Sequence, residues 1–259
     1  MTKKVTSDLS SRFMGLVVCA VFLIGVVTML PASLVSAFVN FDRQRVSYMA
    51  ANGTIWNGSF KNVNIGSAPL GDISFRLSAL SLLTLSPKFD LSAKEGAVIG
   101  DAIVSVNPAQ RITIADLNAD LDLGALAPYG ILGAPTQGIA RVSADKIALS
   151  PKKGCINADG TLWTNVLNAP AYRYDMPALP LNGDVTCEGE QLLVVLEGEN
   201  DRAGAEIILR INKDLAYELA ARAYSPEDDI NSALRFLGFE DADGELVYGS
   251  AGIFRSAGS

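Results

Sequence analysis

The feature that most constrains this chain is a long run without a charged side chain, from Phe13 to Phe41. A helix over most of this run extends roughly 40 Å, which exceeds the hydrocarbon core of a bilayer at about 30 Å. Lys3, Lys4 and Arg12 precede the run and give it a positive flank. Because short positive segments stay in the cytoplasm, we expect the rest of the chain to lie on the other side of the membrane.

This pattern predicts a cytoplasmic segment over residues 1–12, a transmembrane anchor over residues 13–39 and a periplasmic domain over residues 40–259. The alternative is a signal peptide, because "VSA" at positions 35–37 fits the small-residue pattern of a cleavage site. A signal peptide has an apolar region of only about 7–15 residues, and this run is much longer. We therefore expect a single-pass membrane protein. Under either interpretation the bulk of the chain lies outside the cytoplasm, in the periplasm or its equivalent.

Composition excludes several classes of function. The formal net charge is −7, whereas binding to nucleic acid requires a basic face. The chain contains no histidine, so neither a Ser-His-Asp triad nor a histidine-ligated zinc site can form. We expect a protein that is not an enzyme, with no catalytic residues, no metal, no cofactor and no small-molecule substrate.

The three cysteines fall into two groups. Cys19 lies inside the apolar run, where a thiol acts as a small apolar group. Cys155 and Cys187 remain as a pair in an oxidising compartment, which favours a disulfide. The alternative is two separate buried thiols.

After the apolar run the dominant pattern is an alternation of period two, which is typical of half-buried β-strands. "ISFRLS" is a clear case, with Ile73, Phe75 and Leu77 on one face. We expect two strands around a turn at Asn57-Gly58, a favoured hairpin step. The fold class is therefore mostly β, with an N-terminal transmembrane helix and a continuous antiparallel β-rich domain.

Three segments depart from this regular alternation. In "RITIADLNADLDL" the apolar positions change phase, so we expect a bulge near Ala115-Asp116. "ALSLLTLS" breaks the alternation as either a short helical turn or a buried crossing. One short helix is predicted near residues 226–237, with Ser225 as its N-cap and Gly238 at its end.

Both tryptophans follow the same Gly-Thr-aliphatic step, "GTIW" ending at Trp56 and "GTLW" ending at Trp163. An indole at the end of a strand most often fills core space, so we expect both to be structural packing residues, and the alternative is contact with a partner. The repeated step also suggests two related β units that meet near residue 135.

The chain resembles the protein N family of the type II secretion system. The residues that carry the resemblance, in order after the apolar run, are "NGTIWNGSF", "ISFRLSALSLLTLSPKFDLSA", "GDVTCEG" and "LRFLGFEDADGELVYGSAGIF". The resemblance implies an accessory inner-membrane component of the machine that exports folded proteins across the outer membrane. It implies other secretion-system proteins as partners and no catalytic residues.

A second hypothesis is a membrane-tethered module that binds or transfers lipid along an apolar groove of β-strands. Its support is the apolarity of strands such as "QLLVVLEGE". The sequence does not separate a closed core from an open groove.

Overall fold

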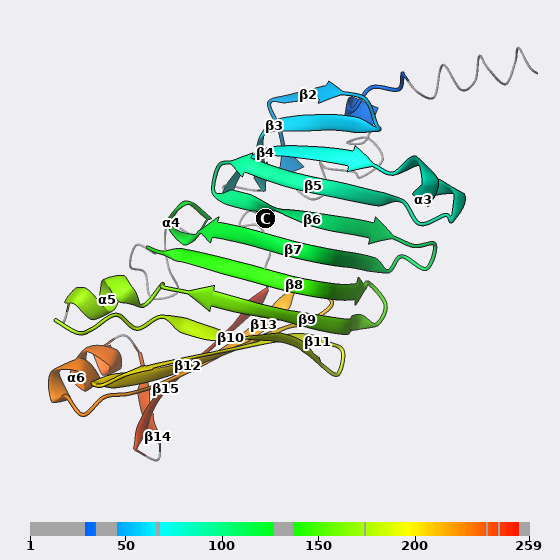
Figure 1. Ribbon diagram of the computed structural model, residues 1–259. Helices are drawn as coiled ribbons and strands as arrows, with labels where there is room; N and C mark the ends of the chain where they lie inside the picture. The colour runs from blue at the N-terminus through cyan, green and yellow to red at the C-terminus, as the bar shows by residue number, and fades with distance from the viewer. Residues whose placement is uncertain are drawn as a thin grey trace, which may run out of the picture.

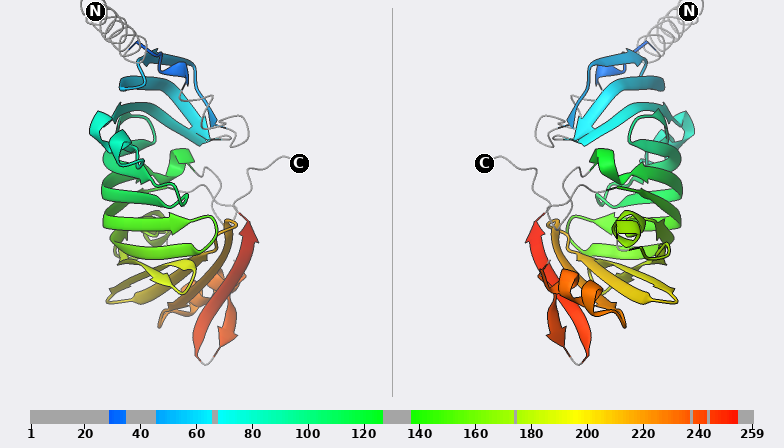
Figure 2. Two further views of the ribbon diagram at one scale, coloured as in Figure 1. Left: turned by 90° about the vertical axis from the view of Figure 1, so that its right-hand side faces the viewer. Right: turned by 90° about the vertical axis from the view of Figure 1, so that its left-hand side faces the viewer.

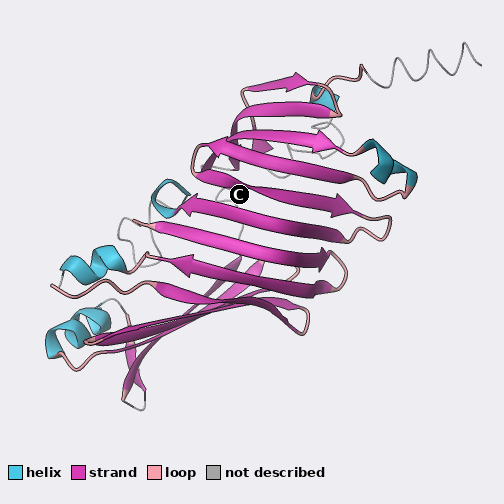
Figure 3. Cartoon of the chain, in the orientation of Figure 1, coloured by secondary structure: helices cyan, strands magenta, loops and turns pink. Residues whose placement is uncertain are grey.

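The computed structural model describes residues 29–34, 46–65, 68–126, 137–173, 175–236, 238–242 and 244–253. Its core is one 15-stranded sheet, shown in Figures 1 and 3. The strands are β1 (Val46–Ser47), β2 (Ala50–Gly53), β3 (Asn57–Ile65), β4 (Ala68–Leu77), β5 (Lys88–Glu95), β6 (Val98–Val106), β7 (Ile112–Asp122), β8 (Ile139–Ser150), β9 (Gly154–Thr164), β10 (Leu181–Glu188), β11 (Gln191–Asn200), β12 (Ala203–Ile211), β13 (Ala216–Tyr224), β14 (Glu240–Ala242) and β15 (Glu245–Ile253). The helices with complete bounds are α3 (Ala79–Leu83), α4 (Leu123–Leu126), α5 (Asn168–Arg173) and α6 (Asp228–Phe236).

The sheet is an antiparallel meander. From β3 to β13 each strand pairs with the next strand along the chain, then β15 pairs with β13, and β14 lies outside β15. At the other edge, β1 and β2 both pair with β3. The prediction of a continuous antiparallel β-rich domain is therefore confirmed.

The predicted anchor and the predicted junction of two β units fall mostly outside this description. Residues 13–28 and 35–39 of the anchor are not described, and neither are residues 127–136 around position 135. Within the ranges given above, no helix is long and apolar enough to cross a membrane.

The two faces of the sheet differ in chemistry because side chains alternate across a strand. The strand register places Val142, Leu162, Gly183, Leu196, Ile207 and Ala221 in one row across β8 to β13. The adjacent row, on the opposite face, contains Arg141, Trp163, Asn182, Glu197, Glu206 and Arg222. We call the first the inner face and the second the outer face.

The sheet is curled rather than flat (Figure 2). Side chains converge on the concave side of a curled sheet and splay apart on the convex side, so the face with the buried residues is the inner one. The larger core cluster consists of inner-face residues, namely Ala144, Ile147, Leu181, Val185, Val194 and Leu196. A second cluster lies at the N-terminal strands and consists of Ala32, Phe60, Val63 and Phe75.

The predicted bulge in β7 is confirmed. Between β6 and β7, Asp101 is opposite Asn118 and Ile103 is opposite Ala115, so β7 has two residues, Asp116 and Leu117, where β6 has only Ala102. Asp116 has a φ of 50°, in the left-handed region where Asp and Asn are the most tolerant residues after glycine. The extra residue lets Ile114 and Leu117 both contact the inner core cluster despite their opposite parity.

The predicted turn at Asn57-Gly58 is wrong, because both residues belong to β3. The β2–β3 hairpin turns two residues earlier, at Ile55-Trp56, where the Thr54 N–H donates to the Asn57 carbonyl at 3.0 Å. Gly53 permits this turn with a φ of 86°. Gly58 serves close packing instead, since a Cβ there would lie 2.7 Å from the ring of Phe75.

The predicted helix near residues 226–237 corresponds to α6. Ser225 caps it, since its hydroxyl accepts a hydrogen bond from the Glu227 N–H at 3.2 Å. Gly238 follows the helix with a φ of 96°, as a C-terminal glycine should. Glu227 also accepts two hydrogen bonds from Arg202 at the start of β12, and this contact lowers the pKa of the Glu227 carboxyl.

Candidate interaction surfaces

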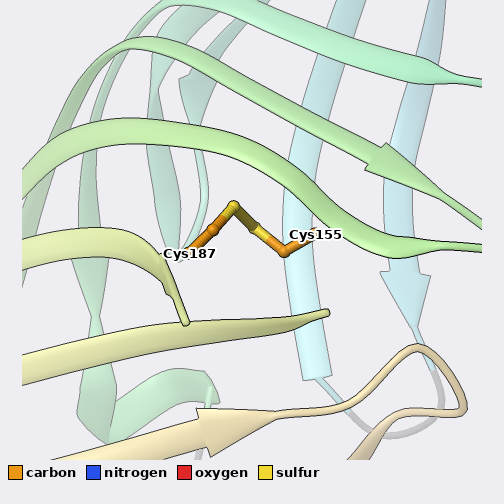
Figure 4. The surroundings of a disulfide bond; sticks show 2 residues. All are labelled: Cys155 and Cys187. Carbon is orange, nitrogen blue, oxygen red and sulfur yellow. A yellow bond between two sulfur atoms is a disulfide. The ribbon is translucent and has the colours of Figure 1, made fainter. Parts of the chain in front are cut away.

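The predicted disulfide is present. Cys155 in β9 and Cys187 in β10 are bonded, with Cα atoms 5.7 Å apart (Figure 4). Backbone pairing between β9 and β10 covers residues 160–164 and 181–185 only. The disulfide therefore joins the two strands beyond the end of their ladder, beside a hydrogen bond that the Cys155 N–H donates to the Glu190 carbonyl at 2.8 Å.

The two tryptophans occupy different positions. Trp56 lies half-buried in the β2–β3 turn, and its carbonyl accepts a hydrogen bond from the Leu77 N–H at 2.9 Å. Trp163 lies half-buried on the outer face of β9, with the Arg141 guanidinium 5.9 Å from its ring centroid. The repeated sequence step thus does not produce a repeated local structure, and the packing role of both indoles stays a prediction.

The C-terminal edge of the sheet is open along most of β15. This strand pairs with β13 over residues 246–253, but with β14 only over residues 245–247. Along residues 248–253 the ranges that the structure describes contain no strand on the outward side. We call this segment, "YGSAGI", the open edge; it carries no charge and no proline, the two devices that commonly protect an edge strand.

The opposite edge of the sheet is covered at one end only. β1 and β2 both pair with β3, and Pro31 forms a bridge with Thr54 just after β2, but residues 46–52 have no strand on their outward side within the described ranges. The described part of the sheet therefore offers a backbone ladder to another chain at both edges, and the longer edge strand is β15.

The outer face next to the open edge is acidic. By register and alternation, the acidic residues of this face in β10 to β15 are Asp184, Glu188, Glu197, Glu199, Glu206, Glu218, Glu240 and Glu245, against the basic residues Arg210 and Arg222. Both arginines are already paired, Arg210 with Glu188 at 2.7 Å and Arg222 with Glu206 at 3.5 Å. This face is therefore negatively charged overall.

Tyr224 stands among these carboxylates. Its ring lies over Gly204, where a Cβ would approach ring carbon Cε1 to 2.1 Å. A hydrogen bond with Glu199, together with burial and the negative charges of Glu199 and Glu245, raises the pKa of Tyr224. The phenol is therefore neutral at physiological pH and presents a hydrogen-bonding group on an otherwise negative surface.

The comparison with protein families decides the membership of this chain. The family model described as "Type II secretion system (T2SS), protein N" matches residues 44–248. This chain belongs to the type II secretion system protein N family. The match confirms the resemblance seen in the sequence and spans the sheet from β1 into β15, the disulfide and both tryptophans. No curated protein and no solved structure shows significant similarity to the chain.

Within this member of the family, sequence reasoning missed the open edge and the acidic outer face. The extent of the open edge is set by the residue of β15 at which its pairing with β14 ends. The family match ends at Tyr248, the first residue of the open edge. The run of small uncharged residues at positions 249–252 was the available signal. The acidic face needed the register, because its members are spread over β10 to β15.

Proposed function

We propose that this protein is a non-enzymatic accessory component of the type II secretion system. In this proposal the part of the predicted anchor before residue 29 holds the protein in the inner membrane, because Pro31 and Ala32 pack on the β domain, and the β domain acts in the periplasm by binding other proteins of the system. The family match over residues 44–248 carries the proposal. The charge-free run near the N-terminus and the absence of histidine support the anchoring and the lack of catalysis.

The open edge of β15 suggests how the domain binds a partner. An extended segment of another protein can add to an exposed strand through main-chain hydrogen bonds, with side chains providing the specificity. On the outer face the added strand would lie beside Gly249 and Ala251, whose small side chains leave room for long ones. Because Glu218 and Glu245 lie nearby on the same face, the complementary partner strand carries Lys or Arg there.

Deletion of the gene tests the proposed function directly. We expect slower or reduced export of folded proteins across the outer membrane, with accumulation of the substrates in the periplasm. The phospholipid composition of the two membranes should stay unchanged. Quantifying a secreted enzyme in periplasm and medium, alongside membrane lipids, checks both statements. Normal export kinetics in the deletion strain would contradict the proposed role in protein secretion.

Lysine substitutions test the open edge. We expect Gly249→Lys with Ala251→Lys to reduce export strongly, because exposed lysines on an edge strand oppose pairing with another chain. The fold should survive, since a Cβ at position 249 meets no atom within 4 Å and Ala251 is exposed. Thr186→Lys is the matched control, because Thr186 lies exposed on the outer face of the interior strand β10. Equal export by the edge variant and the control would contradict the proposal that a partner binds at the open edge.

The inner face favours a second candidate function, the binding of lipid. Its residues in the middle of the sheet, such as Ala102, Val104 and Val106 in β6, are only half-buried although they are apolar. An acyl chain is a chemically suitable cover for such a surface. Failure of phospholipid transfer between membranes in the deletion strain, with normal protein export, would favour this function over the first.

A further inference from the structure

The short helix α3, between β4 and β5, has its polar and apolar sides reversed. Ser81 is the buried residue, with only 6% of its surface exposed, whereas Leu80 and Leu83 are 77% and 82% exposed. Leu85, in the turn after the helix, is 72% exposed. A water-facing helix shows the opposite pattern, with apolar residues towards the core.

This exposure belongs to an ordered local structure. The Ser81 hydroxyl accepts a hydrogen bond from the Lys88 N–H at 2.9 Å, and the Ser81 carbonyl accepts one from the Ser86 N–H at 3.2 Å. These bonds hold the turn in a shape that directs the leucines outwards. Leu85 even adopts a φ of 54°, a left-handed conformation that favours glycine or asparagine. A leucine at such a position indicates a use for its side chain.

The leucines lie at the end of the sheet where the proposed anchor joins the domain. Asn57 at the start of β3 pairs with Arg76 near the end of β4, just before α3. On the other side of Asn57, the Ile55 N–H donates to the Leu30 carbonyl at 3.0 Å. Residue 29 follows residues 13–28, the part of the predicted anchor that precedes the described residues, and Figure 1 shows residues 29–34 and α3 at the same end of the strands.

The charges around α3 suit a lipid surface. Residues 77–87 contain no charged side chain, and Arg76 and Lys88 flank them. Both flanking residues are exposed, and within the described ranges no ion pair of either is found. Apolar side chains between basic ones are typical of segments that lie in the interface of a membrane with anionic lipids.

We propose that Leu80, Leu83 and Leu85 insert into the periplasmic surface of the membrane that holds the anchor, with Arg76 and Lys88 at the lipid headgroups. This inference rests on the proposed anchoring by the apolar run before residue 29. With two points of attachment, the domain has fewer orientations on the membrane than with the anchor alone. Figure 1 shows β14 and the adjoining part of β15 at the opposite extreme of the sheet from α3, so this end of the domain faces away from the bilayer.

Lipid quenching of a fluorophore tests the insertion. The full chain with Cys19→Ala and Leu83→Cys is labelled with an environment-sensitive dye and placed in nanodiscs of phosphatidylethanolamine and phosphatidylglycerol. We expect a blue-shifted emission and strong quenching by phospholipids that carry a spin label on the acyl chain. The matched control carries the label at Glu240→Cys in β14, an exposed position that should show neither effect. Leu80→Ser with Leu85→Ser should reduce quenching at position 83 without unfolding, because both leucines are exposed.

Each other outcome overturns the inference in a distinguishable way. A chain that stays in the nanodisc but shows an unquenched label at position 83 contradicts insertion and leaves the anchoring intact. If that label becomes shielded only when solubilised secretion components are added, the leucines bind a protein instead. Failure of the protein to stay in the nanodisc would contradict the proposed anchoring, and the proposed insertion of the leucines, which rests on it, would be contradicted as well.

Discussion

Replacement of Leu181 by alanine should destabilise the domain more than any other single truncation on the inner face. Leu181 is 0% exposed, the value for a side chain closed off from solvent. It lies at the start of β10, between β9 and β11, and its Cδ2 atom fills the space over Gly198. Paired strands on both sides resist collapse into the cavity, so we expect a loss of about 3–5 kcal/mol in the free energy of unfolding.

Urea denaturation of the full chain in mild detergent measures this loss. Leu181→Met is the matched control, because it conserves volume and should cost less than about 1.5 kcal/mol. A loss below about 1 kcal/mol for Leu181→Ala would mean that the inner face is not closed at this strand and accommodates the change, since collapse of the site lowers the cost.

Removal of the disulfide should have the next largest effect. The bond closes a loop with a sequence separation of 32 residues. The chain-entropy model gives about 3–4 kcal/mol for a loop of this length. We expect Cys155→Ala with Cys187→Ala to lower the free energy of unfolding by this amount, and we expect the end of the β9–β10 ladder to open first.

Amide hydrogen exchange separates this effect from a general destabilisation. Loss of protection should begin around residues 154–159 and 186–190, beyond the paired residues of β9 and β10. Cys19→Ala is the control and should change nothing in the periplasmic domain. Recovery of both thiols in free form by non-reducing peptide mapping of the wild type would contradict the bond itself.

The elements that the sequence predicted share one property: their signals are local. The alternation of Ile73, Phe75 and Leu77, the change of phase at Asp116 and the caps Ser225 and Gly238 are each readable within a few residues. The turn at Asn57-Gly58 was mispredicted because the dipeptide has a second use. Gly58 is needed where β3 packs closely against Phe75, a contact that only the paired strands reveal.

The candidate sites depend on contacts between residues that are far apart in the sequence, so they were harder to predict. The disulfide was an exception. Cys155 and Cys187 are the two cysteines outside the apolar run, and the compartment predicted for them is oxidising. The exposure of Leu80 and Leu83 is invisible in a sequence where "ALSLLTLS" fits a buried segment equally well. Ser81, which replaces the expected apolar contact by hydrogen bonds to Lys88 and Ser86, is what turns the leucines outwards.

The meander has a consequence for how this protein folds. From β3 to β13 each strand needs only its predecessor in the chain as a template, so loop closure is short at every step. A chain that is exported N-terminus first can therefore assemble strand by strand while its remainder is still being translocated. During this process the latest strand is always an unprotected edge. The folded sheet keeps such an edge at β15, where residues 248–253 have no outward strand within the described residues.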